Sequence, residues 1–292
     1  MFERHVAGRD IASMRLSGAK LRSRVDPRIA GKVRGRRIEG ARRIGKYLLV
    51  DLAGDLTLIS HLGMSGRWLF YRDAPDETLT HVHVRVRFKD GSWLLFQDPR
   101  RFGLLRLVER DRVSDDPSIA ILGPDPLAST LTGETMFGFA RGAKVNVKNF
   151  LIDQRRIAGI GNIYASEILF RARVSPRRRA GTLTLGDWER VGEEIRAVLS
   201  EAVERMGTTF STYRTLWNEP GTYGDELFVY DRAAEPCRKC RTPIRRIVQG
   251  QRSTFFCPTC QNGSSPRDRD RSRRATLDRS RNRRAARRLR AR

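Results

Sequence analysis

Four cysteines constrain this chain more than any other feature of its sequence. They form two Cys-x-x-Cys pairs that are separated by 16 residues: Cys237 with Cys240, and Cys257 with Cys260. Two residues between thiolates let both sulfurs of a pair reach one tetrahedral ion at about 2.3 Å. Residues 244–256 have the character of a β-hairpin with its tip at Gly250-Gln251. The pattern therefore predicts a zinc ribbon in which one structural Zn²⁺ holds the fold and performs no chemistry.

A strong positive charge is spread over the whole chain. The formal net charge is +25, and the 13 Arg and 3 Asp of residues 264–292 account for +10 of it, so residues 1–263 keep +15. Such a charge favours a polyanionic partner. The alternative is a compositional bias towards arginine, which supplies 51 of the 58 basic residues. The arginine-rich end offers few apolar residues for a core, so it is predicted to be disordered.

The apolar segments are too short for a membrane protein. No run approaches the roughly 18 apolar residues that cross a bilayer, and the N-terminus MFERHVAGRD lacks the apolar stretch of a signal peptide. We therefore expect a cytoplasmic protein, in which clustered cysteines bind metal rather than form disulfides. We also expect a monomer that is associated with the nucleoid through DNA and makes no membrane contact.

Residues 41–108 show the pattern of antiparallel β-structure. The apolar runs 46–52 and 56–62 flank a turn at 53–55, and the runs 81–88 and 92–97 flank a turn that contains Asp90-Gly91. Short strands joined by tight turns are typical of two packed antiparallel sheets.

The pattern changes to helices after residue 127. Residues 145–156 and 162–172 carry apolar positions at helical spacing on either side of a glycine-bearing turn. A longer helix opens at Thr184, has Asp187 as its capping partner, and stops at Gly207. Residues 211–231 are predicted to form an ordered loop that leads to the cysteines.

Six segments, taken together and in order, resemble the formamidopyrimidine-DNA glycosylase and endonuclease VIII family, and most closely its formamidopyrimidine branch. They are GKYLLVDL (45–52), HLGMSG (61–66), DPRRFG (98–103), LGPDPL (122–127), DQRRIAGIGNIYASEILF (153–170) and the zinc ribbon. The resemblance implies an α+β multidomain protein. Its expected parts are an antiparallel β-sandwich (1–125), a helix-two-turn-helix domain (126–232), the zinc ribbon (233–262) and the disordered tail (263–292).

The resemblance also implies base excision repair. Such enzymes are bifunctional glycosylases and abasic-site lyases that extrude an oxidised base from duplex DNA, and the gap in the stack must then be filled. Met64 and Phe102 are the expected apolar wedges, and Arg100 is the expected partner of the estranged base. This set resembles that of the branch which prefers 8-oxoguanine and formamidopyrimidines.

Further residues are implied to bind DNA or to take part in the chemistry. Asn162 opens a helix whose first amides could hold a phosphate. Arg252 matches an arginine that grips phosphates beside the lesion, and Lys46 matches a lysine that helps in β-elimination; both are catalytic candidates. The expected further DNA contacts are His81, Lys144 and Lys148. His83 is expected to share a strand face with His81.

The start of the chain departs from the family pattern. Family members begin with a nucleophilic proline followed by a glutamate that acts as general acid, whereas this sequence opens Met1-Phe2-Glu3. The resemblance therefore implies that about a dozen residues are missing, and Lys46 is the nearest candidate amine. Two hypotheses stay open: an ordinary glycosylase whose true start lies upstream, and a lesion-binding protein that does not excise bases. A third, a transcription regulator with a zinc ribbon, leaves HLGMSG and DPRRFG unexplained.

Overall fold

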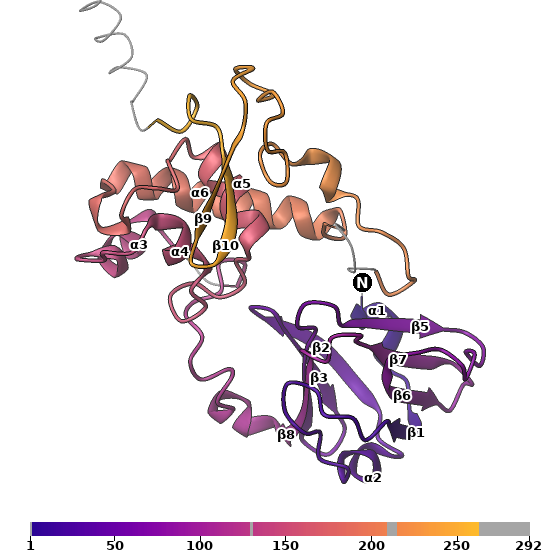
Figure 1. Cartoon of the computed structure of the whole chain (residues 1–292). Helices are drawn as coiled ribbons and strands as arrows, with labels where there is room; N and C mark the ends of the chain where they lie inside the picture. Colours follow the sequence, from indigo (N-terminus) through magenta and orange to yellow (C-terminus); the bar gives the residue numbers. More distant parts are fainter. Residues whose placement is uncertain (1, 129–130, 209–214, 263–292) are drawn as a thin grey trace, which may run out of the picture.

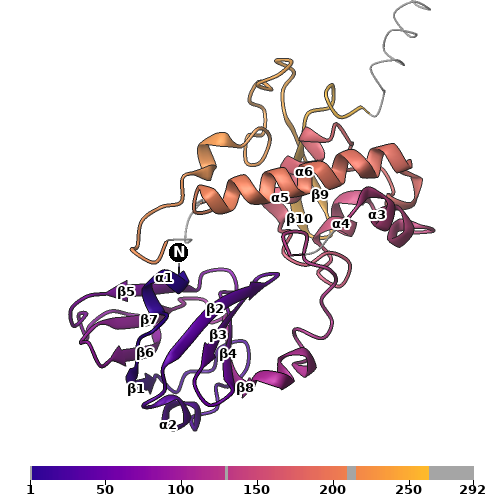
Figure 2. The same cartoon turned by 180° about the vertical axis from the view of Figure 1, so that it is seen from behind.

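The computed structural model describes residues 2–128, 131–208 and 215–262. Within these ranges the chain forms two lobes joined by the segment 110–127 (Figure 1, Figure 2). One lobe holds the sheets β1–β8, and the other holds helices α3–α6 and the hairpin β9–β10. This arrangement confirms the predicted α+β multidomain class. The arginine-rich tail lies outside the described residues.

The first lobe is a sandwich of two four-stranded antiparallel sheets, with strand orders β1-β6-β7-β5 and β2-β3-β4-β8. The strand bounds are β1 (Ile11–Leu16), β2 (Ile38–Ile44), β3 (Tyr47–Leu52), β4 (Leu56–His61), β5 (Arg67–Tyr71), β6 (Val82–Phe88), β7 (Trp93–Gln97) and β8 (Leu104–Glu109). Two short helices, α1 (Phe2–Val6) and α2 (Ile29–Val33), and a 3₁₀-helix at Arg110–Asp115 flank the sheets.

The core of the sandwich lies between the two sheets. Its largest fully buried side chains include Phe88 and Phe96 from one sheet and Leu52 from the other. Each contributes about 1.5–3 kcal/mol through burial. Trp68 is also buried, and its indole nitrogen donates to Ser60 Oγ at 3.0 Å across the sheets.

The predicted turns form where the sequence placed them. The β3–β4 turn has positive φ at Gly54 and Asp55, and the β6–β7 turn has positive φ at Gly91, whose amide donates to Phe88 O at 3.2 Å. The histidine prediction was wrong in one respect: His81 is exposed, whereas His83 is buried. His81 precedes β6 with a φ of 61°, so the alternation of the strand does not extend to it.

The second lobe contains four α-helices: α3 (Gly133–Ala140), α4 (Val147–Ile152), α5 (Asn162–Arg171) and α6 (Leu185–Glu204). Thr184 and Asp187 form the predicted capping box at the start of α6. The sequence analysis missed α3 and made α4 too long, because Asp153 ends the helix in an extended conformation. No helix in the described part of the chain has both the length and the apolarity to cross a membrane.

The hairpin of β9 (Arg245–Gln249) and β10 (Arg252–Phe256) packs against α5. Its tip is Gly250-Gln251, as predicted, and both residues have positive φ. Side chains at three places attach the ribbon to the helices: Asn162 Nδ2 donates to Ser253 O at 2.9 Å, Gln249 Nε2 to Pro176 O at 3.0 Å, and Gln261 Nε2 to Val174 O at 3.0 Å.

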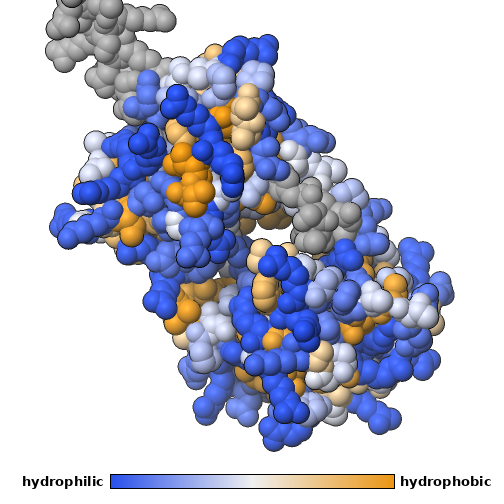
Figure 3. Space-filling view, in the orientation of Figure 1, coloured by the Kyte–Doolittle hydropathy of each residue, from blue (hydrophilic) through white to orange (hydrophobic). Residues whose placement is uncertain are grey.

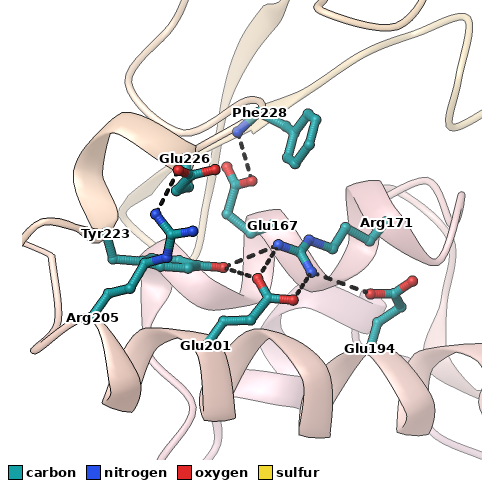
Figure 4. A network of polar contacts seen from close by, with 8 residues as sticks. All are labelled: Glu167, Arg171, Glu194, Glu201, Arg205, Tyr223, Glu226 and Phe228. Carbon is teal, nitrogen blue, oxygen red and sulfur yellow. Dashed lines mark hydrogen bonds and ion pairs between the residues drawn. The ribbon is translucent and has the colours of Figure 1, made fainter.

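A buried carboxylate fixes the segment that enters the ribbon. Glu167 of α5 accepts the backbone amides of residues 228, 229 and 230 at 2.8–3.0 Å. One turn later, Arg171 pairs with Glu201 of α6 and donates to Tyr223 Oη (Figure 4). The 3₁₀-helix that holds Tyr223 spans Tyr223–Glu226. Helix α5, helix α6 and the approach to the ribbon are thus tied together.

Candidate nucleic-acid interface and metal centre

The four cysteine sulfurs converge at the base of the ribbon. All lie within 4.8 Å of one another, with 3.4 Å between Cys240 and Cys257 and 3.9 Å between Cys237 and Cys260. Ligands of a tetrahedral zinc ion stand about 3.8 Å apart, so the donor set fits the metal. The amides of Lys239 and Cys260 donate to sulfurs at 3.4 Å. The cysteines therefore hold one structural zinc, as predicted.

The ribbon has only a small apolar core of its own. Cys237 and Cys257 are buried with Ile244 and Phe255 of the ribbon and with Phe170 of α5. A core of this size supports little structure alone, and zinc coordination supplies the rest of the folding free energy.

Two loops of the sandwich, residues 61–66 and 98–103, lie against each other; we call them the wedge loops. The buried Asp98 joins them by accepting hydrogen bonds from Ser65 Oγ and, at 2.7 Å, from the amide of Gly103. Ser65 Oγ in turn accepts the amide of Arg100 at 3.1 Å. A Cβ at Gly63 would lie 2.5 Å from the carbonyl carbon of Phe102, so only glycine permits this approach.

The wedge loops expose apolar side chains on a preformed support. Met64 is 65% exposed and Phe102 is 44% exposed. The Arg100 guanidinium lies 4.9 Å from the centre of the Phe102 ring. The structure thus brings two of the three predicted gap-filling residues into contact and links the third through Gly63. Exposed apolar groups on loops so firmly tied to the core are suited to enter a base stack.

Arg22 and His61 also support the wedge loops, and neither role was predicted from the sequence. Arg22 donates to Phe102 O at 3.1 Å and lies 3.2 Å from His61 Nδ1. His61 Nδ1 also accepts the Gly63 amide at 2.8 Å. Partial burial, with Arg22 and Lys46 nearby, lowers the pKa of His61 to about 4. The ring is therefore neutral at pH 7, which suits it to accept hydrogen bonds.

The β2–β3 turn joins the two lobes. Asp125 of the linking segment pairs with Arg43 and accepts the amide of Gly45 at 2.7 Å. A Cβ at Gly45 would lie 3.2 Å from the Cβ of Ala158 in the α4–α5 turn. The segments GKYLLVDL, LGPDPL and IAGIG thus meet here, and the close approach at Gly45 leaves little room for a side chain.

Lys46 extends from this turn to the start of α5. Its Nζ donates to Ile160 O at 2.9 Å, and the same oxygen accepts Gln154 Nε2 at 2.9 Å. Crowding by protein atoms, and secondarily the charge of Arg252, lowers the pKa of Lys46 to about 8. The side chain keeps free surface and lines a cavity. An accessible amine of lowered pKa is able to act as a nucleophile.

The cavity next to Lys46 lies between the lobes and has a volume of about 800 Å³. Figure 3 shows the opening between the lobes. Its lining is mainly apolar and comes from both lobes: Leu62, Trp68, Leu127, Tyr164, Val203, Met206 and Leu216 are among its residues. Leu216 also accepts a hydrogen bond from the amide of Phe70 in β5, so the segment after α6 touches the sandwich.

The ribbon hairpin and the helices α4 and α5 meet at a group of two cations and one asparagine that we call the cationic junction. It contains Lys148, Asn162 and Arg252. Asn162 is the first residue of α5, as predicted. The Arg252 side chain is exposed and makes no hydrogen bond or ion pair with the described residues. Lys148 is fully buried, so the predicted direct phosphate contact does not fit its place in the structure.

The other predicted DNA contacts lie at the surface. Lys144 is exposed on the segment before α4, and His81 is exposed before β6. Neither is joined to the cationic junction by a hydrogen bond or ion pair in the described part of the chain. Their roles in DNA binding stay predictions.

Comparisons with known proteins agree with this geometry. Residues 1–105 match the "Formamidopyrimidine-DNA glycosylase N-terminal domain", residues 122–214 the "Formamidopyrimidine-DNA glycosylase H2TH domain", and residues 234–263 the "Zinc finger found in FPG and IleRS". A formamidopyrimidine-DNA glycosylase of Methylococcus capsulatus is 42% identical over 258 residues, which cover 88% of this chain and 94% of that protein. The chain belongs to the formamidopyrimidine-DNA glycosylase family.

Other members of the formamidopyrimidine-DNA glycosylase family give the same result. The enzyme of Burkholderia pseudomallei is 42% identical over 263 residues, covering 89% of this chain and 95% of that protein. Two solved structures of the Lactococcus lactis protein, one with Fapy-dG DNA and one with abasic-site DNA, have TM-scores of 0.81. Each is 29% identical and covers 89% of this chain and 95% of that chain.

Proposed function

We propose that this chain recognises 8-oxoguanine and formamidopyrimidines in duplex DNA by extruding the damaged nucleotide, and that it opens abasic sites with an amine. The observation that carries the proposal is that the same protein has exposed apolar side chains on the wedge loops and a cavity between its lobes. Exposed Met64 and Phe102 would fill the gap in the stack. The cavity of about 800 Å³ would receive the nucleotide that leaves the stack, and ligand pockets measure about 300–1,000 Å³.

Relatives support the substrate class. Solved structures similar to this chain were obtained with DNA that contains Fapy-dG, an abasic site or carbocyclic 8-oxo-G. One Lactococcus lactis complex holds an oxidised pyrimidine instead. We assign this chain to oxidised purines because Met64, Arg100 and Phe102 match the set that the sequence analysis associated with that branch.

Lys46 is the amine that we propose for abasic sites. Its Nζ would attack the C1′ aldehyde of the opened sugar and release water to form an imine; loss of a C2′ proton then expels the 3′ phosphate. Only the free amine attacks, and a pKa of about 8 leaves roughly a tenth of it free at pH 7. Lys46 also lines the cavity, and its place there and its lowered pKa are the grounds for assigning this step to it.

One observation favours the second candidate function, a damaged-DNA-binding protein without base excision. The Lys46 ammonium is hydrogen-bonded to Ile160 O and must lose both a proton and this contact before it reacts. Lys46 would therefore act slowly, while the wedge loops and the cationic junction bind DNA without it.

Borohydride trapping separates the two functions. The chain as printed and a form that begins Met-Pro-Glu are incubated with 8-oxoguanine duplex, preformed abasic duplex and undamaged duplex. We expect the extended form to be trapped on 8-oxoguanine DNA. The printed chain should bind the same DNA and should be trapped slowly on abasic DNA alone, at Lys46 by peptide mapping. That rate should rise as the pH rises through about 8, because deprotonation frees the amine.

Lys46→Met is the matched variant for this experiment, since it keeps the length of the side chain and removes the amine. Its trapping on abasic DNA should vanish while its affinity falls only slightly. Equal affinity of the printed chain for damaged and undamaged duplex would contradict the proposed recognition. Efficient trapping of the printed chain on 8-oxoguanine DNA would contradict the limited role of Lys46.

A further inference from the structure

Lys148 is a buried lysine without a hydrogen-bond partner among the described residues. The whole residue is shielded from solvent. Buried charges in proteins are normally paired, since an unpaired one costs much of the folding free energy. The one charged group that bears on Lys148 in the described structure is Arg252, which is also a cation. The ammonium of Lys148 therefore costs folding free energy that no group among the described residues offsets.

The neighbours of Lys148 share this incomplete bonding. Buried oxygens without a partner among the described residues belong to Asn149 of α4, Asn162 of α5, and Gln249 and Thr254 of the hairpin. These elements are in contact: Asn149 lies against Gly250 at the hairpin tip, and Asn162 donates to Ser253 O. Of the nine buried side-chain nitrogen and oxygen atoms that lack a partner in the described ranges, five thus belong to Lys148, to Asn162 or to their neighbours on α4 and the hairpin.

The surface above Lys148 suits an anion. Arg252 is exposed and makes no ion pair in the described part of the chain, and the amide end of the ten-residue helix α5 opens beside it. A charge behind such a surface, surrounded by protein rather than water, acts on a bound anion with little screening.

We propose that Lys148 is a positioning residue of the cationic junction: its buried charge holds a DNA phosphate against Arg252 and the start of α5 without touching it, at the expense of folding stability. This proposal deepens the proposed function but needs only a phosphodiester, because it does not depend on a lesion. It replaces the direct phosphate contact expected from the sequence.

Binding of a phosphate should change the pKa of Lys148. Burial, and secondarily Arg252, lowers the pKa of Lys148 to about 8. A phosphate brought close to the ammonium stabilises the charged form and raises this pKa. Around pH 8 the protein should therefore take up a proton as it binds DNA. Lys46, whose pKa burial and Arg252 lower to about 8, is a second group near the junction that titrates there, whereas Arg252 and the side-chain amides of Asn149, Asn162 and Gln249 do not. Proton uptake that falls in Lys148→Met and is kept in Lys46→Met therefore belongs to Lys148.

Lys148→Met tests the proposal, because methionine fills much of the same volume without the charge. We expect the melting temperature of this variant to rise and its affinity for undamaged duplex at pH 7 to fall roughly tenfold. Lys144→Met is the matched control. It removes the same charge from an exposed position four residues away, so its affinity should fall in a salt-dependent way with no rise in melting temperature.

Proton uptake on DNA binding would not change if the role of Lys148 were purely structural, so it tests the proposal directly. Calorimetric titration of undamaged duplex at pH 8, in two buffers of different ionisation enthalpy, should show uptake by the wild type and by Lys144→Met and less by Lys148→Met. The wild type alone offers a second test, since the Lys148 pKa followed by NMR should rise when duplex is added.

Three results would overturn the proposal. They are unchanged affinity of Lys148→Met, a lower melting temperature of that variant with unaltered proton uptake, and a Lys148 pKa that stays fixed on DNA addition. The proposed function fails separately, through equal binding of damaged and undamaged duplex, and that result leaves the Lys148 measurements intact.

Discussion

The wedge loops and the cationic junction are built in opposite ways. In the wedge loops the buried polar groups are paired: Asp98 accepts from Ser65 and Gly103, and the residues left at the surface are apolar. In the cationic junction Lys148 and several neighbouring oxygens have no hydrogen-bond partner within the described ranges, and the surface residue Arg252 is charged. A surface that must enter a base stack has to be rigid, whereas one that receives a phosphate needs positive charge that the phosphate can offset.

Loss of zinc should have the largest effect, and it should affect the cationic junction but not the wedge loops. Chelation, or Cys240→Ser, should unfold the ribbon and lower affinity for all duplexes by roughly a hundredfold or more, because zinc coordination supplies about 10 kcal/mol to such a site. The sandwich has its own apolar core and should keep its folded state. Fluorescence anisotropy with labelled duplex and limited proteolysis measure the two effects. Full DNA affinity in a chelated, zinc-free sample would show that the junction does not need the ribbon.

Asp98→Ala should have the next largest effect, this time on the wedge loops. It leaves Ser65 Oγ and the Gly103 amide without their acceptor, so the free energy of unfolding should fall by about 3 kcal/mol. Denaturant unfolding measures the change. The exposed Asp111→Ala is the control and should alter stability by no more than about 0.5 kcal/mol. An equal loss in both variants would mean that Asp98 does not hold the loops.

Met64→Ala should have a smaller effect, on DNA recognition by the wedge loops and not on stability, because it removes an exposed wedge and leaves the core unchanged. The preference for abasic over undamaged duplex should fall about tenfold, since the gap in the stack is left unfilled. The melting temperature should stay within experimental error, as Met64 is 65% exposed. Competition binding with the two duplexes gives the ratio. A preference that survives in the double variant with Phe102→Ala would rule out the wedge role.

Arg252→Gln should show the smallest effect and the opposite pattern. Affinity should fall by roughly fivefold for damaged and undamaged duplex alike, and the slope of log affinity against log salt should decrease by about one, because one phosphate contact is lost. Binding measured over a series of salt concentrations tests this. A loss confined to damaged DNA would place Arg252 with the wedge residues instead.

The sequence predicted the parts of the molecule that depend on local patterns. Tight turns such as Asp90-Gly91, the capping box of Thr184 and Asp187, and the cysteine pairs each occupy a short stretch whose chemistry fixes its conformation. The exposure of Met64 and Phe102 followed from motif resemblance rather than from hydropathy, which would have placed both in the core.

What could not be predicted depends on contacts between distant segments. Arg22 reaches the wedge loops from a part of the chain with no recognisable motif. Lys148 has the same residue type as Lys144, and only the packing of the hairpin against α4 and α5 makes one buried and the other exposed. Helix α3 was missed because Gly133 and Gly138 weaken its helical pattern.

The carboxylate of Glu167 has a mechanical consequence. It gathers three consecutive amides at the entrance to the ribbon, and Arg171 on the same helix is bound to α6 (Figure 4). A force on the entrance to the ribbon would therefore pass into α5 and α6 together rather than stop at the cysteine pairs.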